Sequence, residues 1–165
     1  MKKFLSILIV LLCLAGCDSL SKKSVDIDQH YLSVIDAIKQ HEVFSESSNY
    51  FDISTEMAKI DGGYRFYVTI DNPRVAMYDI EAVAIESDVD YRNNMAANIG
   101  IFEDTVYCMV PNQKNSEKGY VTGMVVSGVS ERSATTLYVY VSFKNEDYSE
   151  VYSDYLKFDV SYQAE

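Results

Sequence analysis

The sequence predicts a mostly β domain, namely an antiparallel β-sandwich of about seven strands preceded by one amphipathic N-terminal helix. Three observations lead to this prediction. Apolar and polar residues alternate through most of residues 50–162, which is the period of a half-buried strand. Turn-forming residues separate the alternating runs. Helical spacing of apolar residues occurs before residue 45 and not after it, whereas a parallel sheet would need helices between its strands.

Residues 26–44 are predicted to form the helix. Its apolar residues recur at helical spacing and make one stripe: Ile27, Tyr31, Val34, Ile35 and Ile38. Asp26 is suited to cap the first turn, with Gln29 three residues later. The stripe either packs on the sheet of its own domain or receives a partner. We expect the first, because an isolated helix of this length is marginal in water.

Seven runs are predicted to be strands: residues 51–57, 64–70, 75–86, 105–110, 120–129, 136–144 and 151–162. Asp61-Gly62-Gly63 predicts a hairpin between the first two. Residues 87–94 form a polar loop, and residues 99–102 are ambiguous. Gly123 and Gly128 are two candidate positions for a bulge.

The strand rhythm of residues 50–162 resembles the small immunoglobulin-like sandwiches of bacterial surface lipoproteins. The resemblance implies two packed antiparallel sheets. It rests on the spacing of strands and turns and not on a diagnostic motif. The buried Trp and paired Cys residues of true immunoglobulin domains are missing, since the chain has no Trp and its three Cys are Cys13, Cys17 and Cys108.

The N-terminal segment has the build of a secretory signal. Lys2 and Lys3 precede an apolar run over residues 4–14, which is too short for an ordinary membrane span of about 20 residues. The segment ends in Leu14-Ala15-Gly16-Cys17, which resembles the lipobox of bacterial lipoproteins. This resemblance implies a signal peptide at residues 1–16, cleavage by signal peptidase II before Cys17, and a lipid, including palmitate, on that cysteine.

The implied lipid would hold the protein to the extracytoplasmic face of a membrane in the cell envelope. Residues 17–25 would then be the lipidated cysteine and a short polar tether. Asp18 resembles the signal that retains enteric Gram-negative lipoproteins in the inner membrane, and it would carry no sorting meaning in a single-membrane bacterium. The domains expected are therefore 1–16, 17–25, 26–44 and 50–162.

The charge of the chain excludes a nucleic-acid partner. The full sequence carries a formal net charge of −11, with 14 basic and 25 acidic residues. Loss of Lys2 and Lys3 with the signal leaves 12 basic residues and a charge of −13. Such a surface is repelled by nucleic acid and by anionic lipid. The partners expected are the membrane, through the lipid on Cys17, and a protein of the envelope.

No catalytic set is recognisable, so we expect a protein that is not an enzyme and has no cofactor. His30 and His41 would be separated by about 16 Å along one helix and could not share a metal ion. Cys108 is expected to be a buried, inert thiol. Glu86, Asp88 and Asp90 alternate across a loop but lack the glycine and terminal glutamate of an EF-hand, so a solvated turn is favoured over a calcium site.

Tyrosine is the one compositional oddity, with 14 Tyr in the chain. A tyrosine offers an apolar ring with a polar tip, which suits a binding surface and equally suits a half-buried strand position. Four tyrosines near the C-terminus are the candidate binding residues: Tyr138, Tyr140, Tyr152 and Tyr155.

These observations favour a lipid-anchored, non-enzymatic binding or accessory module of the cell envelope. An immunity or inhibitor lipoprotein that neutralises a toxin or hydrolase at the membrane is the alternative, because acidic surfaces attract basic enzymes. A hydrolase that uses pairs of acidic residues is the third and weakest hypothesis.

Overall fold

The computed structural model describes residues 18–92 and 94–164. The expected signal peptide at residues 1–16 and the candidate lipidation site Cys17 lie outside the described residues. Within them, one helix is followed by seven strands and one short 3₁₀ helix: α2 (Asp18–Gln40), β1 (Asp52–Ile60), β2 (Gly63–Asp71), β3 (Tyr78–Glu86), β4 (Ala97–Ile99), η1 (Ser116–Lys118), β5 (Gly123–Ser130), β6 (Ala134–Lys144) and β7 (Val151–Ser161).

The strands form two sheets, in the orders β1-β2-β5 and β4-β3-β6-β7, and all pairs within them are antiparallel. The main core lies between the sheets and is lined by the inward-facing residues of both, such as Phe66, Val139 and Leu156. The predicted two-sheet, mostly β architecture of seven strands is therefore confirmed.

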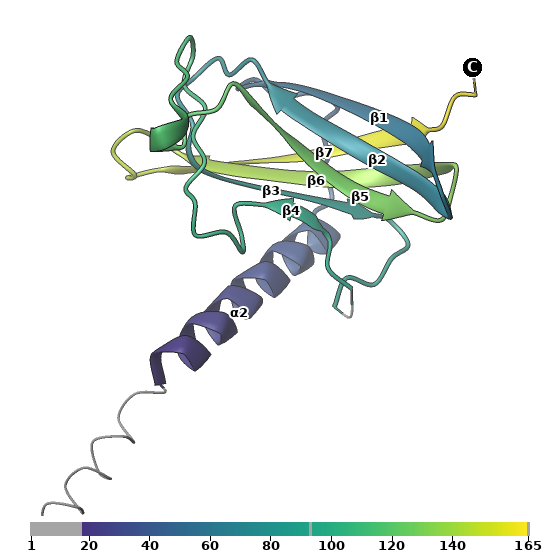
Figure 1. Ribbon diagram of the computed structural model, residues 1–165, viewed down its shortest axis with the longest axis horizontal. Coiled ribbons are helices and arrows are strands. Elements are labelled where there is room, and N and C mark those ends of the chain that lie inside the picture. The colour runs from purple at the N-terminus through teal and green to yellow at the C-terminus, as the bar shows by residue number, and fades with distance from the viewer. Residues whose placement is uncertain (1–17, 93, 165) are drawn as a thin grey trace, which may run out of the picture.

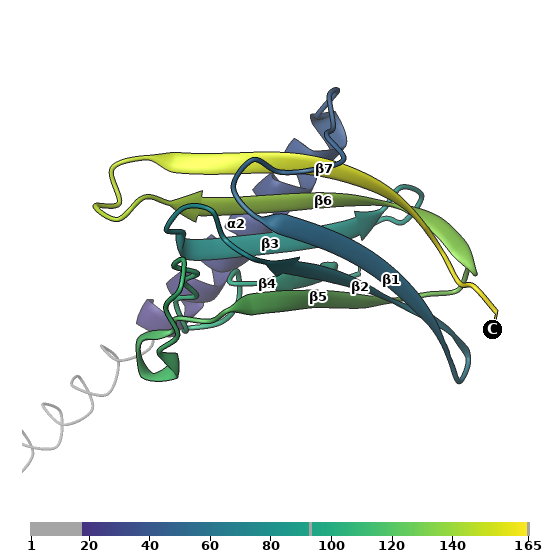
Figure 2. The same ribbon diagram turned by 90° about the horizontal axis from the view of Figure 1, so that it is seen from above.

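Helix α2 forms a third layer on the outer face of the four-stranded sheet (Figure 1). Viewed from above, the helix crosses this sheet obliquely (Figure 2). Its residues Tyr31, Val34, Ile35 and Ile38 are buried in a second apolar cluster together with Val83 and Ile85 of β3. The expectation that the stripe packs on its own domain is confirmed for these four residues, and the four-stranded sheet is apolar on both faces.

The bounds of the helix differ from the predicted 26–44. The helix starts at Asp18, so Asp26 lies inside it and does not cap its start, and most of the expected tether 17–25 is helical. The helix ends at Gln40, four residues early, because the chain there joins the sheet. The Ser45 N–H donates to the Tyr155 carbonyl at 3.0 Å, and the Lys157 N–H donates to the Ser45 carbonyl at 3.0 Å.

The strand predicted at residues 105–110 is wrong. Only Cys108 and Met109 pair there, in isolated bridges to Tyr120 and Met77. The segment runs beside the start of β3, where the Ile80 N–H donates to the Tyr107 carbonyl at 3.0 Å, but these bonds do not extend into a continuous ladder. The seventh strand is instead β4, next to the ambiguous residues 99–102.

A bulge at Gly123 or Gly128 is also absent, since β2 and β5 pair in unbroken register. Gly128 is needed for a different reason, because a Cβ there would collide with the ring of Phe66 on β2. The register shift lies between Tyr78 and Glu81 of β3, where Asp79 has a φ of 50° and pairs with Lys144 at 2.5 Å.

Candidate functional site

The four candidate tyrosines do not form one surface. Tyr138, Tyr140 and Tyr155 lie on the outer face of the four-stranded sheet and belong to the cluster under α2. The ring of Tyr155 stacks on His41 with 3.7 Å between centroids, and Tyr138 packs on Phe44 at 4.6 Å. Tyr152 belongs to the core between the sheets, where it stacks on Phe143. Contacts within the fold therefore occupy much of these rings.

Both histidines also make contacts within the fold. Nε2 of His30 lies 2.9 Å from each carboxylate oxygen of Glu81 on β3. His41 lies just beyond the end of α2 and stacks on Tyr155. Across the described ranges, no group of three His, Cys, Asp or Glu side chains could hold a metal ion. The two histidines thus help to fix α2 on the sheet at opposite ends of the contact.

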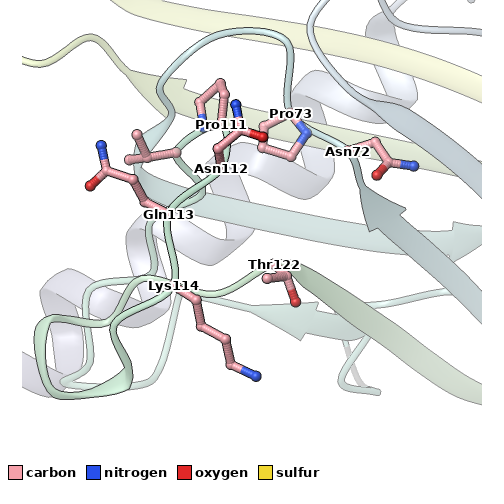
Figure 3. A pocket seen from close by; sticks show the side chains of 8 residues that line it. Asn72, Pro73, Pro111, Asn112, Gln113, Lys114 and Thr122 are labelled. Atoms are coloured by element: carbon pink, nitrogen blue, oxygen red, sulfur yellow. The ribbon is translucent and has the colours of Figure 1, made fainter.

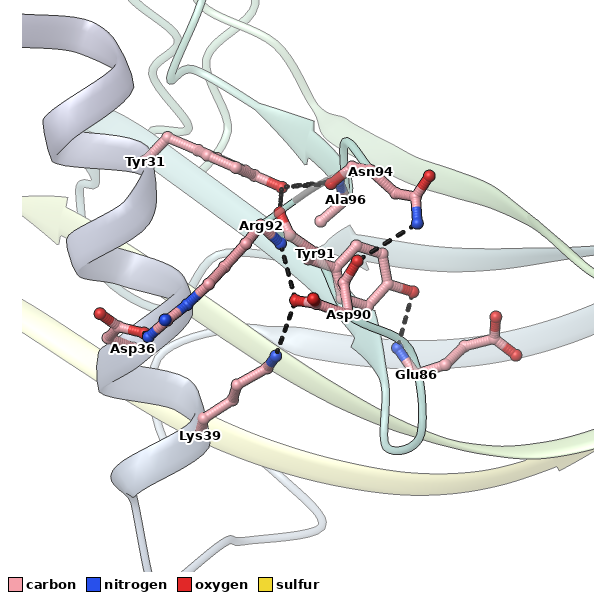
Figure 4. Close-up of polar contacts among 9 residues, drawn as sticks. All are labelled: Tyr31, Asp36, Lys39, Glu86, Asp90, Tyr91, Arg92, Asn94 and Ala96. Atoms are coloured by element: carbon pink, nitrogen blue, oxygen red, sulfur yellow. Dashed lines mark hydrogen bonds and ion pairs between the residues drawn. The ribbon is translucent and has the colours of Figure 1, made fainter.

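The described residues of the loop after β3, 87–92 and 94–96, are called loop 87–96 below, and a tyrosine hydroxyl of α2 contacts their backbone (Figure 4). The Tyr31 hydroxyl accepts a hydrogen bond of 2.8 Å from the Ala96 N–H. The same hydroxyl lies 3.4 Å from the carbonyl oxygens of Tyr91 and Asn94. Burial raises the pKa of Tyr31 above its ordinary value, so this hydroxyl keeps its proton. One side chain of the helix therefore organises the backbone of the loop.

Further contacts hold residues 90–92 of loop 87–96. The Tyr91 hydroxyl accepts a 3.0 Å hydrogen bond from the Glu86 N–H, and burial raises the pKa of Tyr91. Arg92 pairs with Asp36 of the helix at 3.1 Å. Lys39 lies 3.9 Å from an oxygen of Asp90. These exposed ion pairs add little stability each, but they orient the loop.

A hollow lies on each side of loop 87–96. The helix-side hollow, of about 360 Å³, lies between α2 and the loop and is lined by residues such as Tyr31, Leu32 and Phe102. The strand-side hollow, of about 560 Å³, lies between the loop and the end of β5 and is lined by residues such as Glu86, Val129 and Ser130. Tyr91, Asn94 and Met95 line both hollows, so the loop is their common wall.

Exposed apolar side chains follow this wall from the helix to β5. Leu32 is 38% exposed, Met95 is 69% exposed and Val129 is 56% exposed. Methionine is flexible and polarisable, and it is common on surfaces that accept partner proteins. An exposed apolar ridge between two hollows is the kind of surface that buries well in a protein interface.

The strand-side hollow is acidic. Its lining carries four carboxylates, from Glu86, Asp88, Asp90 and Glu131, and one cation, Arg132, which gives a formal charge of −3. Arg132 pairs with Asp88 at 2.7 Å. Hydrogen bonding to the Arg132 guanidinium is the main cause that lowers the pKa of Asp88, and the same contact raises the pKa of Arg132. Both groups therefore stay charged at neutral pH.

Glu86 differs from its acidic neighbours because only 5% of it is exposed. Its Oε1 atom accepts a 2.6 Å hydrogen bond from the Ser130 hydroxyl of β5. The solvated turn expected for Glu86, Asp88 and Asp90 is thus wrong for Glu86, which ends β3 inside the fold.

A hollow of about 460 Å³ lies at the other end of the sandwich (Figure 3). The segment after β2 supplies Asn72 and Pro73, and the loop before η1 supplies Pro111, Asn112 and Lys114. The backbones of Asn72 and Asn112 are left-handed, with φ of 45° and 61°. Its lining is mostly neutral, and Lys114 is its one charged residue. The arrangement brings together no acid–base pair.

Sequence reasoning did not find the site around loop 87–96. The sequence shows that acidic residues alternate at Glu86, Asp88 and Asp90, but it does not show that Glu86 is buried. The available signal was the presence of Tyr91 and Met95 in an otherwise polar stretch, which indicates a loop with apolar contacts.

The chain matches no known protein-family profile, and no curated protein matches it. Among the described residues, no helix is both long and apolar enough to cross a membrane.

Proposed function

We propose that this protein is a lipid-anchored lipoprotein of the cell envelope that acts as a non-enzymatic binding or accessory module. The lipobox-like Leu14-Ala15-Gly16-Cys17 supports the anchor, which would hold the domain at the extracytoplasmic face of a membrane. Asp18 would retain it in the inner membrane of a Gram-negative cell. Two or more acyl chains give stable anchoring without any membrane-binding surface on the domain.

The observation that carries the binding function is the exposure of Met95 between the two hollows. The described residues of loop 87–96 are hydrogen-bonded to Tyr31 of α2 and to Glu86 of β3, and these contacts order the backbone near Met95. Preorganised surfaces lose less conformational entropy when they bind. The four tyrosines are a poorer choice of binding surface, because three of them lie in the cluster under α2.

A site-specific crosslinking experiment tests this function. A photoreactive amino acid replaces Met95 in the full-length protein, which is expressed in its native membranes. The matched control places the same amino acid at Val151, which is also exposed but begins β7 at the opposite end of the sandwich. A partner protein crosslinked from position 95 and not from 151 supports the proposal. No partner from either position, or equal yields from both, contradicts it.

The Cys17→Ser variant tests the anchor separately. The proposal predicts that labelled palmitate is incorporated into the wild-type protein and not into the variant, and that the variant leaves the membrane fraction. Incorporation into Cys17→Ser would contradict lipidation at this residue.

The alternative function, an immunity or inhibitor lipoprotein that neutralises a toxin or hydrolase, is favoured by the charge of −3 on the strand-side hollow. Acidic surfaces accelerate association with basic proteins. The crosslinking experiment separates the two functions, because the alternative requires the partner captured at position 95 to be a toxin or hydrolase that loses activity in the complex.

We also propose that the sandwich is immunoglobulin-like. One sheet contains strands one, two and five, and the other contains strands four, three, six and seven. Immunoglobulin domains of the constant type place strands A, B, E and D in one sheet and C, F and G in the other, and the variable type adds C′ beside C. The two sheets here match the orders A-B-E and C′-C-F-G, without a strand D. This correspondence supports the assignment.

A further inference from the structure

We propose that the outer edge of β5 pairs with the same edge of a second copy of the chain, so that two three-stranded sheets join into one six-stranded sheet. The inference goes beyond the proposed function, because it requires neither the lipid anchor nor an envelope partner. In Figure 2, β5 forms one border of the fold, and it is the last strand of its sheet, paired on one side with β2.

The first observation is that β5 is the least protected of the four strand edges. Proteins normally blunt an edge by charge, by short length or by a covering segment, because its unpaired N–H and C=O groups attract other strands. β4 has three residues. β1 and β7 each contain three charged residues, and Ser45 bonds to the outer edge of β7. β5 has eight residues and none of them is charged.

The outer edge of β5 also lacks a covering segment. Across residues 18–92 and 94–164, no backbone hydrogen bond joins this edge to another part of the chain. The side chains that point away from the core are Val125, Ser127 and Val129. Val125 is 49% exposed and Val129 is 56% exposed. Valine favours strands and packs well against valine across an antiparallel pair, so the edge is suited to accept another strand.

The outward row of β5 is self-complementary, which favours a second copy as the occupant. It reads Val125, Ser127, Val129 in one direction and valine, serine, valine in the other. An antiparallel pair centred on Ser127 places Val125 opposite Val129 of the second copy, and does so twice, as a two-fold interface requires. Glu131, the first charged residue after β5, would face Gly123 of the second copy, which has no side chain.

This register also avoids electrostatic repulsion between two acidic molecules. The chain has a formal net charge of −11, but the paired segment contributes none of it. Like charges directly opposite each other destabilise a strand pair, and the register creates no such pair. A foreign strand would need an unprotected edge of its own, whereas every copy of this chain carries one.

Site-specific crosslinking of the full-length protein in whole cells tests the contact. Ser127→Cys places a thiol at the two-fold axis, where a short, membrane-permeable bismaleimide should join it to the same residue of the second copy. The matched control is Ser54→Cys, an exposed serine on β1 at the opposite edge of the sheet, and the wild-type protein controls for the native cysteines. We expect a covalent dimer from position 127 alone. Equal dimer yields from both positions, or none from 127, would overturn the inference. Capture of a different protein at 127 would overturn the second copy as the occupant.

Sedimentation equilibrium of the full-length protein in density-matched detergent measures the affinity. The wild-type protein should show a concentration-dependent dimer. Ser127→Lys should weaken the dimer by about tenfold or more, because it sets two like charges opposite each other. Ser54→Lys should leave the affinity unchanged. A wild-type protein that stays monomeric at every concentration, or a Ser127→Lys variant that dimerises as tightly as the wild type, would refute the proposal.

A pair of opposite charges tests the register. Val125→Lys and Val129→Glu should each weaken the dimer. The double variant Val125→Lys/Val129→Glu should regain affinity, because each introduced lysine lies opposite the introduced glutamate of the second copy. This gain cannot come from misfolding of a single variant, so the test stays decisive if one of them is unstable. Losses that add strictly in the double variant would overturn the proposed pairing.

Discussion

The Tyr31 hydroxyl on α2 accepts a 2.8 Å hydrogen bond from the backbone N–H of Ala96, which lies 65 residues later in the chain. This contact joins the N-terminal helix to the wall between the two hollows. Because Ala96 is buried, its N–H has no access to water as a substitute acceptor. The shape of the candidate binding surface therefore depends on the docking of the helix.

Removal of this hydroxyl tests that dependence. Tyr31→Phe should lower the free energy of unfolding by about 1–3 kcal/mol, since it leaves a buried donor unsatisfied. Urea unfolding gives the free energy, and hydrogen exchange at Ala96 should accelerate in the variant. The control is Tyr67→Phe on β2, whose hydroxyl makes no hydrogen bond within the described residues. An equal effect of both substitutions would contradict the role of Tyr31.

Because the apolar stripe of α2 is buried, truncation of a side chain within it should lower the free energy of unfolding more than truncation of an exposed side chain one turn away. Ile35 is fully buried, whereas Leu32 is 38% exposed. Ile35→Ala should cost about 2–5 kcal/mol, because a buried side chain is lost and a cavity remains. Leu32→Ala should cost much less. Chemical denaturation of both variants measures the difference, and similar losses would mean that the helix does not pack as described.

Gly128→Ala should destabilise the sandwich by overpacking. The added Cβ would lie 2.8 Å from Cε1 of Phe66 and 3.2 Å from the Cβ of Ala97. Such overpacking costs about 1–3 kcal/mol. The double variant Gly128→Ala/Phe66→Leu should lose less stability than the sum of the two single variants, because the smaller side chain makes room. Strict additivity in the double-mutant cycle would contradict the contact.

Cys108 should resist modification until the protein unfolds. The thiol is 3% exposed, and burial is the main cause that raises its pKa. A raised pKa lowers the thiolate fraction at a given pH, and the thiolate is the reactive form. At mildly alkaline pH, iodoacetamide should therefore label the folded protein far more slowly than the protein in urea. Fast labelling of the folded protein would show that the thiol is accessible. The sequence-based expectation of burial is confirmed.

The strands that alternate cleanly were predictable from the sequence. In β6, Leu137, Val139 and Val141 face the core, as their spacing indicates. The segment around Cys108 and Met109 was mistaken for a strand because a short apolar run also occurs where the chain only forms bridges. Periodicity reports burial of a face, and it does not report whether a neighbouring strand is present to pair with.

The candidate site was less predictable because it depends on contacts between distant segments. Tyr138 and Tyr140 could be placed on one face, but nothing in their spacing indicated that α2 covers that face. Glu86 resembles its neighbours Asp88 and Asp90 in sequence, yet the pairing of β3 with β6 and the nearby Ser130 bury it. The local pattern of apolar and polar residues predicts a helix or a strand. Which polar side chains become buried depends on how the helices and strands pack together.

The position of α2 on the face of β3, β6 and β7 has a consequence for biosynthesis. The helix is made before every strand, but β7 is made last. At a translation rate of about 5–20 residues per second, the stripe that includes Ile35 and Ile38 waits several seconds for its covering strands. A nascent chain that stalls before β7 would lack Tyr155, whose ring belongs to the same cluster, so the stripe would be only partly covered. The uncovered part of the cluster would then be available to chaperones or to aggregation.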